Sequence, residues 1–282
     1  MNPSHKNDYL KMRPGERWQS NMTRNKTIKE PERIVASVTK ALKILDCFTA
    51  AEPELSLKQI HEKTRLYKSG ILRLCGTLVA QRYLTRMPTS NYRLGPKLLI
   101  LGNVYEKSNP LIAVARPILQ ELSAQTGESS ALYIVEGLKR LCLVEQEGSL
   151  PIRYVMTEGK TQELYAGAGG KVLLAYAPEQ IRSMILSKLT LIKMTNSTIV
   201  DRQLLEKEFR TIRERGHAIS LGERIPEIGA IAVPVFDTTQ TVCAALSIGG
   251  LIQRFSAARC REYLKPLKAS AHKLSLLLGY TG

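Results

Sequence analysis

The side chains between Lys68 and Gln81 have the types and spacing best suited to hydrogen bonding with a partner. Four polar residues fall on one helical face: Lys68, Ser69, Arg73 and Thr77. The opposite face is an apolar stripe: Ile71, Leu74, Cys75 and Leu78. This pattern predicts an amphipathic helix packed through its apolar face. The polar face can donate hydrogen bonds to phosphate oxygens and base edges, so we expect it to contact nucleic acid.

The residues before this segment predict a shorter helix over Leu57–Thr64. Ser56 is in position to cap its N-terminus, and Gln59 completes a capping box. Arg65–Tyr67 would form the tight turn between the two helices. Two short helices joined in this way predict a helix-turn-helix.

Two short strands are expected after the second helix, at Tyr83–Arg86 and Tyr92–Leu94. The residues between them include Pro, Ser and Asn, which suit a turn. Arg86 and Arg93 flank this turn and are expected to contact the DNA backbone. Two helices followed by a β-ribbon predict a winged helix-turn-helix, whose second helix enters the major groove.

Two more helices are expected around this module. Ile34–Phe48 should be helical, with its apolar positions packed on one face: Val38, Ala41, Leu42 and Leu45. A helix opening at Gly95-Pro96 should continue to about Glu106. Its apolar residues are spaced as in a coiled coil: Leu94, Leu98, Leu101 and Tyr105. That spacing fits either core packing or a dimer seam, and both remain open.

Beyond Pro110, strands and helices are interspersed, which predicts an antiparallel-rich α+β domain with helices on one or both faces of its sheet. The expected helices are Leu111–Gln125, Lys171–Tyr176, Pro178–Lys188, Arg202–Arg215 and Ala257–Leu278. The expected strands are Ser130–Glu136, Leu141–Glu147, Ile152–Met156, His217–Leu221, Ala230–Phe236 and Val242–Ile248. A Gly-rich turn, Gly167–Gly170, precedes the second helix.

Basic charge is concentrated in the first part of the chain, whose net charge is +16 over 282 residues. Residues 1–110 hold 20 Lys and Arg against 9 Asp and Glu, and residues 111–282 hold 21 against 16. This distribution favours a polyanionic partner for the N-terminal part. The predicted organisation is a disordered basic arm (1–32), the winged helix-turn-helix (33–94), a linker helix (95–110) and a C-terminal domain (111–282).

No motif predicts catalysis, a cofactor or a metal. The run from Gly167 to Lys171 resembles a phosphate-binding loop, but Tyr165 and Val172 replace the Gly and the Ser or Thr that such a loop needs. The four histidines are scattered, and the five cysteines include no Cys-x-x-Cys pair. Apolar runs are too short for a membrane span, and no secretory signal is recognisable, so we expect a cytoplasmic protein.

Two other functions remain open. The first is an enzyme, which stoichiometric metal or turnover would reveal. The second is a ligand-binding or scaffold protein whose helix-turn-helix contacts another protein. The basic excess of residues 1–110 argues against this second interpretation, unless the partner protein is acidic.

Short motifs in both halves of the chain follow one another in a characteristic order. They are Val38–Leu45, Lys68-Ser69, Tyr92–Gly95, Ala115–Pro117, Gly169–Ala175, Arg213–Gly216, Ile231–Val235 and Ala244–Ile248. In their order and spacing the chain resembles the IclR family of bacterial transcription regulators over about residues 34–279. The resemblance implies a winged-helix domain joined by a linker helix to a GAF-like effector-binding domain. It also implies a homodimer or homotetramer that binds a double-stranded DNA operator and regulates a catabolic operon.

The resemblance further implies a pocket for a small organic or aromatic acid. By position, the pocket would be formed by Ala168, Gly169, Ser220, Ala230, Ser247 and Gly249. The residues of the Gly-rich turn support this independently, because a helix N-terminus offers free N–H groups and a positive dipole end to a carboxylate. The same glycines also fit a tight turn between a strand and a helix with no ligand, and both interpretations remain open. Ser220 and Ser247 would add hydroxyl contacts. The chain departs from the common family pattern at Gly70, Ser220 and Ala230, where Thr, Asp and Cys are frequent, so no one member's effector can be transferred.

Overall fold

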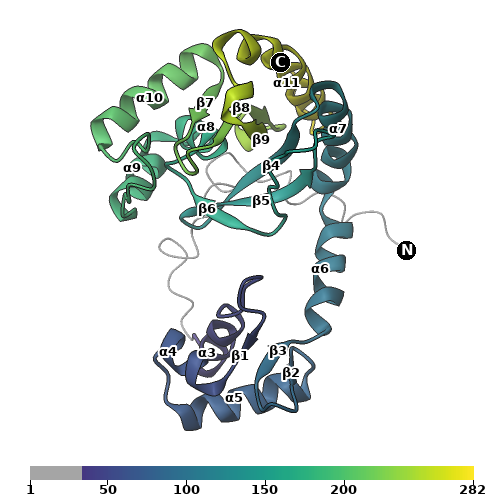
Figure 1. Ribbon diagram of the computed structural model, residues 1–282, viewed down its shortest axis with the longest axis vertical. Coiled ribbons are helices and arrows are strands. Elements are labelled where there is room, and N and C mark those ends of the chain that lie inside the picture. The colour runs from purple at the N-terminus through teal and green to yellow at the C-terminus, as the bar shows by residue number, and fades with distance from the viewer. Residues whose placement is uncertain (1–33) are drawn as a thin grey trace. The chain divides into compact units, whose positions relative to one another are not determined.

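The computed structural model describes residues 34–282, so the predicted basic arm at 1–32 lies outside the described residues. The described chain divides into two compact units, one ending at Asn109 and the other beginning at Pro110 (Figure 1). Within the described residues, no helix combines the length and the apolar character that a membrane span needs. The two units are described separately below.

The N-terminal unit is the winged helix-turn-helix that the sequence predicts. Its helices are α3 (Ala36–Leu45), α4 (Leu57–Thr64) and α5 (Lys68–Ala80). Its strands are β1 (Glu54–Leu55), β2 (Leu84–Arg86) and β3 (Tyr92–Leu94), in the antiparallel order β1-β3-β2. Strand β1 was not predicted, since two residues between a loop and a helix carry too short a pattern to recognise.

A small core holds this unit together. Its fully buried members come from all three helices and all three strands: Ile44, Leu55, Ile60, Ile71, Cys75, Leu84 and Tyr92. The predicted packing face of α3 is wrong in part, because Val38 and Leu42 are 54% and 55% exposed while Ile44 is buried. The helix has more apolar positions than α4 and α5 can cover, and the uncovered ones face solvent.

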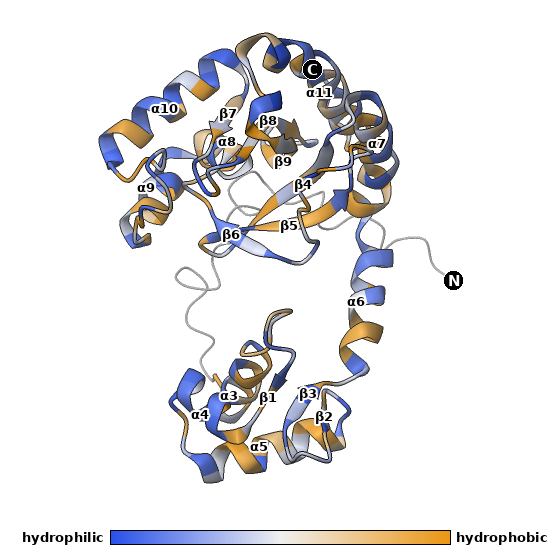
Figure 2. Ribbon diagram, in the orientation of Figure 1, coloured by the Kyte–Doolittle hydropathy of each residue, from blue (hydrophilic) through white to orange (hydrophobic). Residues whose placement is uncertain are grey.

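Helix α6 (Lys97–Ser108) follows the wing, and none of its side chains is buried in the described structure. Its exposed apolar residues are Leu99, Ile100, Leu101, Val104 and Tyr105, each at least 43% accessible. In Figure 2 part of α6 is coloured as hydrophobic. An isolated helix of this length is marginal in water, so burial of this face would stabilise it.

The C-terminal unit is built on one six-stranded antiparallel sheet in the order β6-β5-β4-β9-β8-β7. The strands are β4 (Ser129–Glu136), β5 (Lys139–Gln146), β6 (Thr161–Glu163), β7 (Ala218–Leu221), β8 (Ile228–Phe236) and β9 (Val242–Leu251). Side chains alternate across the sheet, as Tyr133 joins the core on one face and Leu132 the core on the other. Both faces are therefore buried.

Helices cover both faces of the sheet (Figure 1). One face carries α7 (Pro110–Thr126) and α11 (Ala257–Leu277), which follows the short 3₁₀ helix η2 (Ile252–Arg254). The other carries α8 (Ala168–Tyr176), α9 (Glu179–Lys188) and α10 (Arg202–Arg215). Figure 2 shows the alternation of polar and apolar residues that makes α10 amphipathic. The predicted α+β class with helices on the sheet is confirmed.

One predicted strand is wrong. Ile152–Met156 is a loop between β5 and β6, and β6 itself lies several residues later. The segment keeps the alternation of a strand, since Tyr154 and Met156 turn inward while Val155 is half exposed. It has no neighbouring strand, and Ile152 O accepts a hydrogen bond from Arg254 Nη2 (3.1 Å) instead.

Candidate functional site

The turn that presents α5 is held by side-chain hydrogen bonds. Ser56 Oγ accepts from Gln59 N (3.3 Å) and Gln59 Oε1 accepts from Ser56 N (2.8 Å), which is the predicted capping box. At the other end of α4, Thr64 Oγ1 donates to Ile60 O (2.7 Å) and accepts from Leu66 N (3.3 Å). These bonds fix the path of the chain into α5.

The predicted contact residues on α5 form an exposed face: Lys68, Ser69, Arg73 and Thr77. Within the described part of the chain, neither Lys68 nor Arg73 forms an ion pair. Thr77 Oγ1 donates to Arg73 O (3.2 Å), so this hydroxyl is left to act as an acceptor. Tyr67 precedes the helix with 87% of its surface exposed, and the sequence analysis did not single it out.

The two wing arginines differ from each other. Arg93 Nε donates to Glu54 Oε2 (2.8 Å), whereas Arg86 is exposed and has no ion pair among the described residues. Glu54 also accepts from Asn91 Nδ2 (2.9 Å) and Thr89 Oγ1 (3.2 Å), and these bonds lower the pKa of Glu54, with Asn91 contributing most. Glu54 therefore ties β1 to the wing and neutralises Arg93.

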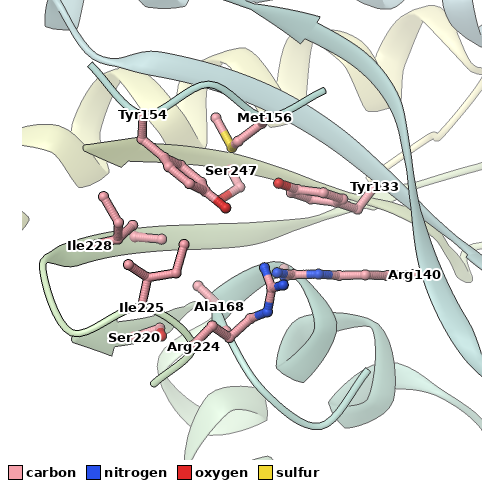
Figure 3. A pocket seen from close by; sticks show the side chains of 13 residues that line it. Tyr133, Arg140, Tyr154, Met156, Ala168, Ser220, Arg224, Ile225, Ile228 and Ser247 are labelled. Atoms are coloured by element: carbon pink, nitrogen blue, oxygen red, sulfur yellow. The ribbon is translucent and has the colours of Figure 1, made fainter. Parts of the chain in front are cut away.

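A pocket lies in the C-terminal unit, beside the N-terminus of α8 (Figure 3). Its empty volume is about 390 Å³, including the solvent at its mouth. Five of the six residues predicted for the effector line it: Ala168, Gly169, Ser220, Ala230 and Ser247. Gly249 does not line it but pairs with Ala230 across β8 and β9, and a methyl group there would lie 3.4 Å from Tyr154 Cδ1.

The glycines before and within α8 are required by close packing. Gly167 has a φ of +88°, and a methyl group on it would lie 2.9 Å from Arg140 Nη2. At Gly169 a methyl group would lie 2.7 Å from Tyr133 Cδ2, and at Gly170 it would lie 2.3 Å from Leu164 O. The backbone at the start of α8 is thus brought against the side chains of the pocket.

Lys171 belongs to a buried ionic network behind this turn. Its side chain is 2% exposed, and its ammonium group lies 2.5 Å from Glu223 Oε1 and 3.1 Å from Glu208 Oε1. It also donates to Ile219 O (2.9 Å). Glu223 Oε2 accepts from Gly167 N (2.9 Å), so one carboxylate joins α8 to the residues after β7. Lys171 therefore anchors the helix and does not line the pocket.

Two arginines that the sequence analysis missed end beside each other in the pocket. Arg140 is 4% exposed, and its guanidinium lies 4.6 Å from the centre of the Tyr133 ring. It donates to Gln162 Oε1 from Nε (3.1 Å) and Nη2 (2.7 Å), but Gln162 carries no charge. Burial lowers the pKa of Arg140, and the nearby Arg224 adds to this decrease. Arg224 Nε is buried with no hydrogen-bond partner among the described residues.

The hydroxyl groups of the pocket are available to different degrees. Ser247 Oγ already donates to Ile231 O (2.9 Å), so it can only accept from a ligand. Ser220 is 5% exposed, and its hydroxyl has no partner among the described residues. In Figure 3 the hydroxyls of Tyr133 and Tyr154 point into the space between them. Burial raises the pKa of Tyr133, which keeps its hydroxyl protonated as a hydrogen-bond donor.

Metal binding and reactive thiols find no support in the described residues. No group of three or more His, Cys, Asp or Glu is placed to hold a metal ion in the described part of the chain. Cys142 and Cys75 are buried, which raises their pKa values to about 12 and about 11. Cys260, which has arginines on both sides in the sequence, is also buried, and burial raises its pKa. Such thiols are protonated at neutral pH.

A winged helix-turn-helix joined in one chain to an α+β unit defines the class of two-domain DNA-binding transcription regulators. The family comparisons agree with this class. Residues 104–276 match the family described as bacterial transcriptional regulator IclR C-terminal, and residues 37–88 match the IclR helix-turn-helix domain. The chain belongs to the IclR family of transcriptional regulators.

Named relatives and solved structures extend over most of the chain. The HTH-type transcriptional regulator XynR of Escherichia coli is 32% identical over 248 residues, which are 88% of this chain and 98% of XynR. An IclR transcriptional regulator from Alicyclobacillus acidocaldarius aligns with a TM-score of 0.79 at 27% identity, over 87% of this chain and 99% of that one. An IclR homologue from Microbacterium hydrocarbonoxydans, solved with 4-hydroxybenzoate, shares the fold at 21% identity with a TM-score of 0.75, covering 87% and 100%.

Proposed function

We propose that this protein is a sequence-specific transcription regulator whose binding to an operator is modulated by a small organic or aromatic acid. One observation carries the proposal. The chain holds an exposed basic helix in a winged helix-turn-helix and, in its other unit, a pocket with one buried and one partly buried arginine, Arg140 and Arg224, that no carboxylate among the described residues neutralises. The exposed basic helix suits the phosphates and bases of DNA. The pocket with its two arginines suits a small organic acid. Such a protein acts on chromosomal DNA and works in the cytoplasm.

In this proposal α5 lies in the major groove of the operator. Arg73 contacts a base edge, and Lys68, Ser69 and Thr77 contact bases or phosphates from the same face. Arg86 holds the DNA backbone from the wing. Arg93 contributes less than Arg86 because Glu54 already neutralises it.

The proposed active form contains at least a homodimer, with two α5 helices about one turn of DNA apart. Support comes from α6, whose five apolar side chains remain exposed in the part of the chain that the structure describes. A second copy of α6 offers the same stripe, and a symmetric dimer buries both. The predicted organisation, with a linker helix at 95–110 between the DNA-binding domain (33–94) and the effector domain (111–282), is part of this proposal.

The acid is proposed to bind at the N-terminus of α8. Arg140, Arg224 and Ser220 supply hydrogen-bond donors there, and Tyr154 lies across the pocket. The complex of the Microbacterium homologue with 4-hydroxybenzoate supports an acid as the ligand, since that molecule is an aromatic carboxylate. The predicted residues Ala168, Gly169, Ala230, Ser247 and Gly249 remain proposals as ligand contacts, with Gly249 one step outside the lining.

We propose that the effect on DNA binding passes through α7. Tyr133 and Arg140 lie on β4 and β5, and α7 packs on these strands from the other face of the sheet. Helix α6 ends at Ser108, and α7 begins at Pro110, so only Asn109 lies between them. A ligand that moves β4 and β5 would therefore displace α7 and the helix before it. The ligand can shift operator binding only by its difference in affinity for the two states.

The test is binding of the purified protein to DNA from its own upstream intergenic region. Fluorescence anisotropy is measured across a salt series, with random-sequence DNA as competitor. We expect tight binding that survives the competitor and weakens at high salt. Equal affinity for both DNAs at every salt concentration would contradict specific recognition of that region.

A further inference from the structure

The charges that line the pocket do not balance. Arg140 and Arg224 each carry one positive charge, and neither forms an ion pair within the described residues. Glu223 is the neighbouring carboxylate, but its two oxygens are taken by Lys171 and by the N–H of Gly167. The pocket is therefore left with two uncompensated guanidinium charges.

The start of α8 adds further donors to the same place. No hydrogen bond in the described structure uses the backbone N–H groups of Ala168, Gly169 or Gly170. All three residues follow Gly167, beside which both Arg140 and Arg224 lie: a methyl group there would be within 3.2 Å of each. Free N–H groups and the positive end of the helix dipole thus point to the same anion as the arginines.

The remainder of the pocket is mostly apolar. Met156, Ile225, Ile228 and Ala230 line it away from the guanidinium groups, together with the ring of Tyr154. In Figure 3 the arginines converge at one end, and Tyr154, Met156 and Ile228 lie across the space from them. A ligand that fits has its charge at one end and an apolar body at the other.

We infer that the effector is a dianion whose two negative charges lie together at one end of the molecule. This inference rests on the proposed acid-binding function and names its ligand class. Two carboxylates on neighbouring carbons, or one phosphate monoester, would neutralise both Arg140 and Arg224. A single carboxylate would leave one of the two neighbouring guanidinium charges without an ionic partner in a pocket where Arg140 is buried and Arg224 partly buried, which is unfavourable. Ser220, with its unpartnered hydroxyl, donates a further hydrogen bond.

The test uses acids that differ only in the number or placement of charges. Calorimetric titration of the full-length protein compares phthalate with benzoate, phthalate with terephthalate, and maleate with fumarate. Phenyl phosphate distinguishes a phosphate monoester from a dicarboxylate. We expect phthalate and maleate to bind at least about tenfold more tightly than their comparison acids, since each gains one close ion pair.

Variants of Arg224 show whether this side chain is responsible for the preference for a dianion. Arg224→Gln should weaken the binding of phthalate by about tenfold or more and change the binding of benzoate much less. Arg224→Lys should retain part of the preference for phthalate over benzoate. Lys139→Gln is the matched control, because Lys139 is adjacent to Arg140 on β5 but is exposed and paired with Glu163. Circular dichroism verifies that each variant is folded.

The outcomes separate the inference from the proposed function. Equal affinities for phthalate and benzoate, both reduced in Arg224→Gln, would overturn the dianion and leave an acid-binding pocket. Tight binding of phenyl phosphate with weak binding of phthalate would assign the dianion to a phosphate monoester. If no acid of either charge binds the wild-type protein, the proposed acid pocket is itself wrong.

Discussion

Among the described residues, two groups of basic side chains form no ion pair, and they lie in different environments. On α5, Lys68 and Arg73 stand in water on an open helical face. In the pocket, Arg140 and Arg224 lie beside each other at the packed start of α8. Exposed charges are screened and inexpensive to maintain, and they attract a long polyanion. Arg140 is buried and Arg224 is partly buried, so their like charges are poorly solvated in the empty protein, and a small anion that neutralises them binds more tightly for that reason.

The largest expected effect is on stability, and it comes from replacing a glycine by alanine in each of the two regions. Gly170→Ala places a methyl group 2.3 Å from Leu164 O, so we expect the C-terminal unit to lose about 3 kcal/mol or more. Gly76→Ala on α5 meets nothing within 4 Å and should stabilise its helix by about 0.5–1 kcal/mol. Urea unfolding followed by circular dichroism measures both. Similar small effects would mean that α8 is packed as loosely as α5.

The second prediction concerns the exposed group. Arg73→Ala should weaken operator binding by about 1–3 kcal/mol if the side chain contacts a base edge. Arg259→Ala is the control, since Arg259 is exposed on α11 in the other unit and paired with Glu262. Anisotropy with operator and with random DNA measures both variants. If Arg73→Ala weakens both DNAs equally, Arg73 contacts phosphate and does not contribute to specificity.

The third prediction concerns Arg224 in the pocket when no ligand is bound. Arg224→Gln removes a charge next to Arg140 and a buried Nε without a partner, so the empty C-terminal unit should gain about 1 kcal/mol. The measurement is thermal unfolding in a buffer free of phosphate and carboxylates. A loss of stability would indicate that Arg224 has a structural function instead.

The smallest effect concerns the wing. The folded-state pKa of Glu54 lies below its ordinary value of 4.5, because the folded protein stabilises the carboxylate. Its contribution to stability is therefore full above the unfolded pKa and is lost as the pH falls through the folded pKa. Glu54→Gln should remove this part of the acid dependence of the N-terminal unit. Because Glu54 is only partly buried, with 24% of its side chain exposed, the change should be smaller in high salt.

The sequence predicts these two regions to different extents, for a physical reason. The α5 face can be recognised because its polar residues repeat with the helical period and follow a capping box. The α8 N-terminus can be recognised from its glycines. Arg140 and Arg224 cannot, since an arginine in a strand or a turn is usually solvated, and only the antiparallel sheet brings them together. The predicted packing face of α3 and the predicted strand at Ile152–Met156 are wrong for a related reason. A pattern of apolar residues does not specify which neighbouring element will pack against them.

The central claim is that the basic residues of α5 bind DNA and the arginines of the pocket bind the ligand. Its most direct test compares two variants in one operator titration without ligand. The operator affinities of Arg73→Ala, Arg224→Gln and the wild type are measured by fluorescence anisotropy at a fixed salt concentration. We predict that Arg73→Ala binds the operator more weakly by about 1–3 kcal/mol and that Arg224→Gln binds as the wild type does. An equal loss in both variants would contradict the account, because the pocket arginine Arg224 would then contribute to DNA binding without a ligand.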